Sequence, residues 1–265
     1  MRKIIFQLIV TIALFFAVWF ALSKVDWMTI FKVEQVSKTT EEKLGDLFWD
    51  LINESEKVIQ NKKITVPLDS LLSRICVSND IDQSQVKLHI IEKDDINAFA
   101  LPYNHLIIYS GLISASENES EISGVICHEL AHMELNHVMK KLIKEVGLSV
   151  LISITIGNSG PDIIMETAKV LSSSAYDRNL EKEADIKAVD YLVKSNINPE
   201  GFAHFLYKLS DNESQLVSYL SWINSHPDSK ERAEYVIEYS SDKPKNYETI
   251  LAQETWDELK VSLKE

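Results

Sequence analysis

The sequence contains few of the residues that build loop-rich or covalently cross-linked proteins. Its 265 residues include only 7 glycines, 6 prolines and 2 cysteines. This composition excludes collagen-like, low-complexity and disulfide-scaffold proteins, and it favours a mainly helical chain with few tight turns. Two cysteines, Cys76 and Cys127, are too few for a disulfide framework, and the sequence leaves their pairing undecided.

The chain also lacks an excess of basic residues. Its 27 Lys and Arg face 40 Asp and Glu, which gives a net charge of −13. A chain this acidic is repelled by phosphate backbones, so nucleic acid is excluded as a partner. The hydrophobic fraction of 45% and the charged fraction of 25% are those of a folded globular protein.

One long apolar run is present, at residues 4–22 (IIFQLIVTIALFFAVWFAL). A helix of this length about matches the ~30 Å hydrocarbon core of a membrane, so the lipid bilayer is an expected partner. Arg2 and Lys3 precede the run, and the positive-inside rule then leaves the N-terminus in the cytoplasm. We predict an anchor over residues 1–25, with a cleaved signal peptide as the alternative.

The rest of the chain, residues 26–265, reads as a small sheet wrapped by helices. Segments rich in β-branched residues predict short strands at 86–92 and 106–109, with a third segment at 97–101 between them. Helical periodicity predicts, among others, long helices over 121–145 and 163–193. The expected fold class is therefore α+β and predominantly helical.

The segment His128-Glu129-Leu130-Ala131-His132 carries the most specific chemistry. Two His at positions i and i+4 of a helix can direct both imidazoles at one ion. Zinc binds neutral imidazole nitrogens and needs a third protein ligand, which leaves one position for a water. Glu129 lies beside that position and can take the proton of the water as general base. We therefore expect one zinc ion per chain.

The third ligand is not supplied by the same helix. A metzincin extension would require Gly at 135 and His at 138, where the sequence has Leu135 and Val138. His137 follows His132 by five residues, about 500° around a helix, and we interpret it as a surface residue.

Two carboxylates on a separate segment are the remaining source of a ligand. Glu181 and Asp185 lie four residues apart and share one face of a predicted helix. One of them can bind the metal while the other accepts a hydrogen bond from a ligand imidazole. The spacing alone does not assign the two roles.

Four blocks then occur in the order of a known family. They resemble the zinc peptidases of the gluzincin type that include the CAAX prenyl proteases, the HtpX heat-shock proteases and the Oma-type membrane peptidases. The blocks, between residues 97 and 232, are NAFALP at 97–102, the HExxH helix at 121–132, RxxExxAD at 178–185, and His226-Pro227 followed by Arg232. The resemblance implies a zincin-like domain whose edge strand borders the active site.

The resemblance also implies roles for the ligand residues. It makes His128, His132 and Glu181 the metal ligands and Glu129 the catalytic base. Asp185 becomes a supporting group behind the ligands. We expect His226 or Arg232 to stabilise the oxyanion of the tetrahedral intermediate. Two alternatives for His226 are a ligand in a resting state and a structural turn before a helix.

The NAFALP block is implied to be the edge strand that binds substrate. An unpaired edge can hold an extended polypeptide through main-chain hydrogen bonds, with little sequence preference. The substrate-binding residues expected here are Asn97, Ala98, Phe99 and Ala100. The family pattern continues with two glycines where this chain has Tyr103-Asn104, so we expect a different loop shape beyond the strand.

The function expected from these features is a zinc-dependent metalloendopeptidase. With one predicted span it is expected to act on membrane or envelope proteins, unfolded or damaged, rather than on prenylated peptides. The expected location is a bacterial inner membrane, single-pass, with the catalytic domain in the periplasm, or the periplasm itself after signal cleavage. A membrane-tethered, zinc-bound chaperone or adaptor is the alternative. His89, His105 and His204 match no ligand position and are interpreted as structural.

Overall fold

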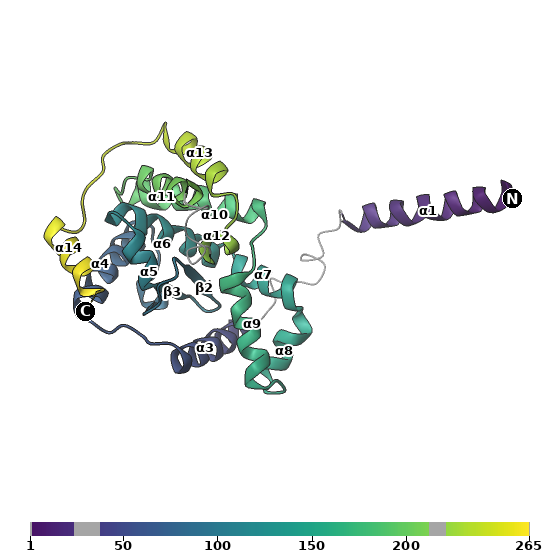
Figure 1. Ribbon diagram of the computed structural model, residues 1–265, viewed down its shortest axis with the longest axis horizontal. Helices are drawn as coiled ribbons and strands as arrows, with labels where there is room; N and C mark the ends of the chain where they lie inside the picture. Colours follow the sequence, from purple (N-terminus) through teal and green to yellow (C-terminus); the bar gives the residue numbers. More distant parts are fainter. Residues whose placement is uncertain (1, 24–37, 212–220, 265) are drawn as a thin grey trace. The chain divides into compact units, whose positions relative to one another are not determined.

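The computed structural model of the chain describes residues 2–23, 38–211 and 221–264 (Figure 1). The chain divides into two compact units, Met1–Ser37 and Lys38–Glu265. In the first unit, helix α1 (Arg2–Ser23) includes the apolar run at residues 4–22, which is thus helical as predicted. Among the described residues, no helix combines the length and hydropathy that a membrane crossing requires. The structure therefore does not confirm the predicted membrane span.

The second unit is built around a three-stranded sheet with the order β1-β3-β2. Its strands are β1 (Lys87–Ile91), β2 (Ala98–Leu101) and β3 (His105–Tyr109). The outer strand β1 runs parallel to β3, while β2 runs antiparallel to β3 and forms the other edge. The three predicted strands are confirmed, and the NAFALP segment is an edge strand.

The turn between β2 and β3 contains the two residues that replace the glycines of the family pattern. Tyr103 and Asn104 have φ angles of 59° and 58°, in the left-handed region. Glycine enters this region without steric cost, and Asn tolerates it better than most residues. The backbone thus takes a conformation that two glycines would favour, and the different loop shape that we expected is not required.

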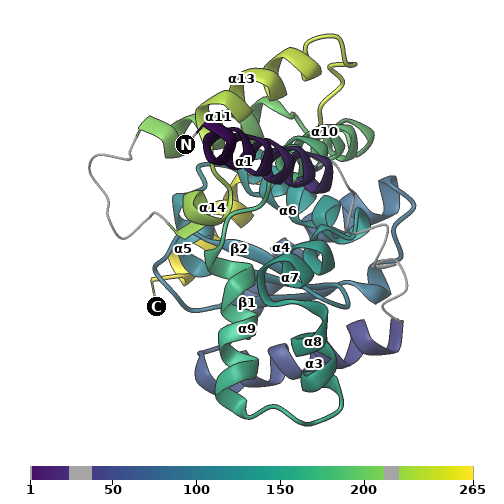
Figure 2. The same ribbon diagram turned by 90° about the vertical axis from the view of Figure 1, so that its right-hand side faces the viewer.

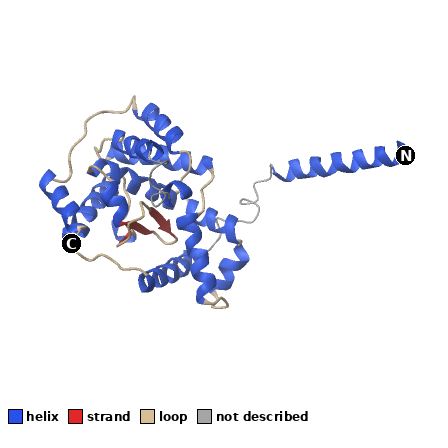
Figure 3. Ribbon diagram, in the orientation of Figure 1, coloured by secondary structure: helices blue, strands red, loops and turns tan. Residues whose placement is uncertain are grey.

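Helices cover both faces of the sheet (Figures 1 and 3). Side chains alternate along β3, so Leu106 and Ile108 belong to the main hydrophobic core, which also contains side chains of α4 (Lys62–Ser78) and α6 (Glu119–Glu134). The opposite face, with His105, meets α3 (Lys38–Ser55). Figure 2 shows α3 and α6 on opposite sides of the sheet.

Two of the predicted long helices are each interrupted. The helix expected over 121–145 ends with α6 and resumes as α7 (His137–Val146). Asn136 between them has a φ of 56°, which an α-helix cannot accommodate. The helix expected over 163–193 is likewise two helices, α9 (Pro161–Ser173) and α10 (Arg178–Lys194). Both predictions of a continuous helix were therefore wrong.

The remaining elements complete the helical shell. They are η2 (Gln83–Gln85), α5 (Ser110–Ala115), α8 (Leu148–Thr155), α11 (Glu200–Asp211), α12 (Ser221–Ser225), α13 (Ser229–Ser240) and α14 (Gln253–Ser262). Helix α6 packs against both α10 and α11. The α11 contact needs glycine at position 124, because a Cβ there would lie 2.4 Å from the Cβ of Phe202. This packing places α6 in the centre of the unit, between the sheet and the helices that carry the other candidate site residues.

Candidate metal centre

Helix α6 presents the first two imidazoles. Its start is fixed by Asn118, whose side chain accepts hydrogen bonds from the backbone N–H groups of Ser120 and Glu121. His128 and His132 follow on one face, and their Nε2 atoms lie 2.9 Å apart. Both side chains are fully buried. The helical spacing therefore brings the two imidazoles together inside the protein.

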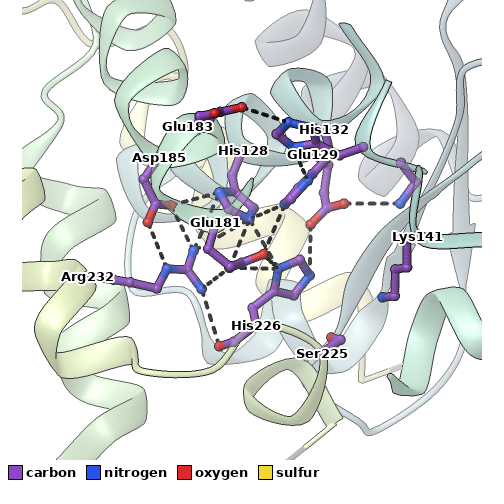
Figure 4. Close-up of polar contacts among 12 residues, drawn as sticks. His128, Glu129, His132, Lys141, Glu181, Glu183, Asp185, Ser225, His226 and Arg232 are labelled. Atoms are coloured by element: carbon purple, nitrogen blue, oxygen red, sulfur yellow. Dashed lines mark hydrogen bonds and ion pairs between the residues drawn. The ribbon is translucent and has the colours of Figure 1, made fainter. Parts of the chain in front are cut away.

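Helix α10 adds two carboxylates that reach different sides of these imidazoles. Glu181 Oε1 lies 3.2 Å from His132 Nε2, and Glu181 Oε2 lies 3.7 Å from His128 Nε2. Asp185 Oδ1 instead lies 2.8 Å from His128 Nδ1, on the far side of that ring. The geometry thus separates two roles that the spacing left open, with Glu181 facing the cluster and Asp185 behind it (Figure 4).

The segment after α12 contributes a third imidazole. His226 Nδ1 lies 3.0 Å from Glu181 Oε1 and 3.2 Å from His128 Nε2. Figure 4 shows His226 turned toward the other three side chains. One donor atom from each of His128, His132, Glu181 and His226 lies within 4.8 Å of all the others. We call these four residues the metal-centre cluster.

The donor atoms of the metal-centre cluster fit a zinc ion. Tetrahedral zinc at about 2.0–2.1 Å from its ligands separates them by roughly 3.3 Å. The separations given above, from 2.9 Å between the His128 and His132 nitrogens to 3.7 Å between His128 and Glu181, bracket that value. Two imidazoles and a carboxylate are also the donor types of catalytic zinc sites.

Two unpaired polar atoms adjoin this cluster. Glu129 Oε1 and His226 Nε2 are buried and have no hydrogen-bond partner among the described residues. They lie 3.3 Å apart, but not in hydrogen-bond geometry. Because buried polar atoms are normally paired, two adjacent exceptions indicate a place where the protein takes up a ligand.

Arg232 of α13 neutralises both carboxylates from behind. Its Nε and Nη2 donate to the two oxygens of Asp185, each at 2.8 Å. Its Nη1 lies 2.6 Å from Glu181 Oε2. The guanidinium is 2% exposed, and Tyr235 Oη also donates to Asp185. Arg232 therefore shares Glu181 Oε2 with His226 and His128, whereas Glu181 Oε1 contacts imidazoles alone, His132 at 3.2 Å and His226 at 3.0 Å.

The pKa values of the two buried glutamates are shifted in opposite directions. It raises the pKa of Glu129 well above its usual range, and the charge of Glu181 adds to this effect. Burial would also raise the pKa of Glu181, but Arg232, His226 and His128 outweigh it and hold that pKa well below the usual range. The site thus contains an ionised Glu181 beside a Glu129 that binds a proton readily.

The imidazoles of the cluster are held neutral. Burial lowers the pKa of His132 to about 4, and it lowers the pKa of His226 to about 4 as well. The pKa of His128 is also lowered, chiefly by burial and then by Arg232, against the opposing charge of Asp185. Neutral imidazole is the form that binds zinc.

Strand β2 lies beside the predicted base. The backbone N–H of Ala100 donates to Glu129 Oε2 at 3.1 Å. Two residues before the strand, the backbone N–H of Trp222 in α12 donates to the carbonyl of Ile96 at 3.2 Å. The four predicted substrate-binding residues, Asn97, Ala98, Phe99 and Ala100, are all buried. The predicted substrate strand is thus next to the site, and α12 contacts the segment that leads into it.

Three neighbours of the cluster escaped the sequence reasoning. His137 was predicted at the surface, but it is fully buried, and its Nδ1 lies 3.0 Å from His132 Nδ1. The ring of Tyr176 stacks on His132 with centroids 4.0 Å apart, and Lys141 Nζ lies 3.9 Å from the Tyr176 centroid. Of these three, only the position of His137 had a signal in the sequence. It is the Asn136 that precedes it, because Asn often ends helices in a left-handed conformation.

Comparison with known proteins decides the family. The chain matches Peptidase family M48 over residues 65–239, a range that includes all four sequence blocks. It belongs to this family. The family predicted from the motifs is confirmed, and with it the class of enzyme, a metalloendopeptidase.

The chain is similar to peptidases from bacteria and from a yeast. It is 24% identical to the beta-barrel assembly-enhancing protease of Yersinia pestis, over 69% of this chain and 40% of that protein. It is 28% identical to the metalloprotease LoiP of Escherichia coli, over 60% of this chain and 65% of LoiP. The mitochondrial metalloendopeptidase OMA1 of Schizosaccharomyces pombe is 23% identical over 74% of this chain and 59% of that protein. The chain thus spans less than two thirds of the length of each of these relatives.

Proposed function

We propose that this chain is a zinc-dependent metalloendopeptidase that cleaves exposed segments of membrane or envelope proteins, unfolded or damaged. The observation that supports this best is the buried Glu129, whose unpaired Oε1 adjoins a cluster of three imidazoles and a carboxylate. The names of relatives, which include a beta-barrel assembly-enhancing protease, agree with a role in protein maintenance. Substrate identity is part of the proposal.

The residues of the site have three proposed roles in hydrolysis: metal ligands, general base and support of the base. His128, His132 and Glu181 would hold the ion, which supplies a Lewis acid and makes water a nucleophile at neutral pH. Glu129 would act as the base that takes a proton from the attacking water and gives it to the leaving amine, a task that suits a carboxyl with a raised pKa. The N–H of Ala100 holds the other oxygen of Glu129 in place.

Substrate would bind along β2. An extended polypeptide can pair with the free edge of this strand through main-chain hydrogen bonds, which favours unfolded segments and demands little of their sequence. Ala100 ties the strand to the base, so a peptide on this edge would lie beside the reacting water. The bond from Trp222 to the carbonyl of Ile96 would have to open for the peptide to extend beyond the start of the strand.

The contacts of Arg232 and His226 suggest different roles for the two. Three nitrogens of Arg232 are engaged by Asp185 and Glu181, so we propose that Arg232 holds those carboxylates and does not bind the oxyanion. His226 is then the remaining candidate donor for the oxyanion. Its contacts with Glu181 and His128 equally suit a fourth ligand in a resting state.

Replacing His226 by Ala distinguishes these two roles. Loss of an oxyanion donor should lower kcat about 10²–10³-fold while zinc remains bound. Loss of a resting-state ligand should instead weaken zinc binding and leave kcat unchanged or higher. Zinc titration and the rate of casein cleavage, measured on the same preparation, separate the two results.

The location remains a proposal based on the sequence. Residues 4–22 would anchor the protein in a bacterial inner membrane in a single pass, with Arg2 and Lys3 in the cytoplasm and the catalytic domain in the periplasm. Removing residues 1–25 should then release the protein from the membrane fraction. An N-terminal sequence that begins near residue 24 in mature protein would instead establish a cleaved signal.

A second candidate function follows from the position of His226. Zinc sites with four protein ligands are structural, whereas catalytic sites keep one position open. A protein that kept His226 on the ion permanently would be a zinc-bound chaperone or adaptor, tethered to the membrane. Wild-type protein that binds one zinc ion but cleaves no unfolded substrate would establish this second function.

The substitution Glu129→Gln tests the proposed function. It keeps the size of the side chain and removes the base, so zinc should remain at one ion per chain while kcat for casein falls about 10²–10⁴-fold. Glu166→Gln, on an exposed carboxylate of α9 (74% exposed), is the matched control and should leave kcat unchanged. Casein cleavage by Glu129→Gln at the wild-type rate would contradict the proposal.

A further inference from the structure

His137 reaches the metal centre because the chain reverses at Asn136. On a continuous helix, a residue five positions after His132 would point roughly 140° away from it. Asn136, with a φ of 56°, ends α6 and lets α7 begin in a new direction. The His137 ring returns to lie with its centroid 5.1 Å from that of His132. It is completely buried there.

The polar contacts of His137 form a directed chain. His137 Nε2 lies 3.3 Å from Glu183 Oε2, and a carboxylate only accepts hydrogen bonds, so this contact favours the tautomer with the proton on Nε2. In that neutral ring, Nδ1 of His137 is an acceptor, and it lies 3.0 Å from His132 Nδ1. With an ion bound between His132 Nε2 and Glu181, His132 would carry its proton on Nδ1 and direct the Nε2 lone pair at the ion. That Nε2 faces His128 and Glu181.

The other imidazole of α6 is oriented in an equivalent way. His128 Nδ1 lies 2.8 Å from Asp185 Oδ1, and its Nε2 also faces the metal-centre cluster. A hydrogen bond to the nitrogen opposite the metal fixes the tautomer and the ring orientation of a ligand His. For His128 that partner is a buried carboxylate, and for His132 it is a second imidazole backed by Glu183, whose side chain is 60% exposed.

We propose that His137 is a positioning residue. It accepts a hydrogen bond from Nδ1–H of His132 and so holds the Nε2 of His132 toward the metal ion. Glu183 supports His137 in this role from the surface. The inference rests on the proposed zinc centre but does not follow from it, because the motif residues alone would bind the ion without a partner for His132.

Zinc affinity, measured by competition with a chromophoric chelator, is the direct test. His137→Leu removes the acceptor and should weaken zinc binding about 10–100-fold. His137→Gln offers an acceptor oxygen and should recover part of that loss. His105→Leu is the matched control, since His105 is a buried His (1% exposed) on the α3 face of the sheet, and its zinc affinity should equal that of wild type.

Cobalt substitution adds a readout that general destabilisation would not change. The visible spectrum of the Co²⁺ form should shift in His137→Leu, and it should remain that of wild type in His105→Leu. Glu183→Ala should weaken zinc binding by a smaller factor than His137→Leu, and Glu166→Ala should not weaken it. Because Glu183 is exposed, this variant still decides the question if His137→Leu does not fold.

The outcomes separate the inference from the proposed function. Unchanged zinc affinity and an unchanged cobalt spectrum in folded His137→Leu would overturn the role of His137 while the zinc centre stands. Unchanged affinity in Glu183→Ala and His137→Gln would overturn it when His137→Leu is unfolded. Wild-type protein that binds no zinc would instead overturn the proposed function itself.

Discussion

Within residues 38–211 and 221–264, two groups of closely packed histidines occur, and they differ in the properties that a metal site requires. The metal-centre cluster brings His128 and His132 to 2.9 Å. On the α3 face of the sheet, His89 Nε2 and His105 Nδ1 approach to 3.0 Å, beside Lys87. We call the group of Asp46, Lys87, His89 and His105 the sheet-face cluster. Similar distances between imidazoles thus occur in two very different environments.

The difference lies in where the protein places its own cation. In the sheet-face cluster, Lys87 Nζ lies 3.0 Å from His105 Nε2 and 2.8 Å from Asp46 Oδ1, so the ammonium takes the position a metal ion would need. In the metal-centre cluster, Arg232 contacts Glu181 Oε2 and lies 3.5 Å from the ring nitrogens of His128, while Glu181 Oε1 lies 3.2 Å from His132 Nε2. The protein's own cation thus lies at the side of the metal-centre cluster, whereas in the sheet-face cluster it lies between the imidazole and the carboxylate.

In a third group, the protein's own cation again contacts the carboxylates. Glu117, Glu121 and His204 have donor atoms close enough to hold an ion. Lys208 Nζ lies 2.6 Å from Glu121 Oε2 and 3.3 Å from Glu117 Oε1, so a charged amine already pairs with these carboxylates. We therefore expect zinc at the metal-centre cluster alone among the three groups.

The largest effect should come from removing one carboxylate of each cluster. Glu181→Ala deletes a proposed ligand, so we expect stoichiometric zinc and casein cleavage to be lost together. Asp46→Ala should change neither. Zinc that exceeds its Kd 1,000-fold stabilises a protein by about 4 kcal/mol, so a chelator should lower the Tm of wild type and of Asp46→Ala but not that of Glu181→Ala. A zinc-dependent Tm that survives in Glu181→Ala would remove the distinction between the clusters.

Removing the cation of each cluster should have a smaller effect, on stability. Arg232→Met leaves two buried carboxylates without their buried cation, which should cost about 3–5 kcal/mol of the free energy of unfolding. Lys87→Met breaks a pair whose side chains are 36% and 50% exposed, so the expected cost is about 1 kcal/mol or less. Denaturant titration in the presence of a chelator measures both, and equal losses would show that burial does not separate the two cations.

Much of the metal-centre cluster could be predicted from the sequence because its geometry is local. The spacing of His128 and His132 places both rings on one helix face, whatever the rest of the fold does. Strands β1 and β3 were also predictable, since their β-branched runs are short and distinct, whereas β2 has no β-branched residue and was placed by its position between them and by the family resemblance. The assignment of Glu181 needed the family resemblance, because i and i+4 spacing treats Glu181 and Asp185 alike.

The remaining features depend on single residues and on tertiary contacts. Periodicity continues through Asn136, so the pattern predicts one helix, and the error then places His137 at the surface. Tyr176 lies on the segment between two helices, and nothing local indicates that its ring will stack on His132. The sheet-face cluster was likewise interpreted only as structural histidines, since Asp46 and His105 are brought together by the packing of α3.

A single histidine accounts for the last predicted effect, the acid sensitivity of the sheet-face cluster. Burial, with the charge of Lys87, lowers the pKa of His105 from 6.5 to about 4, against the opposing effect of Asp46. Between these two pH values the unfolded chain binds more protons than the native one, so stability falls as the pH is lowered from about 6.5 to 4, by at most about 3 kcal/mol. With the metal chelated, His105→Gln should lack this contribution, and Lys87→Met should reduce it because the pKa of His105 rises. Parallel stability curves for wild type and His105→Gln would contradict this prediction. They would show that Asp46 offsets burial and Lys87, so that the pKa of His105 is the same in the folded and the unfolded chain.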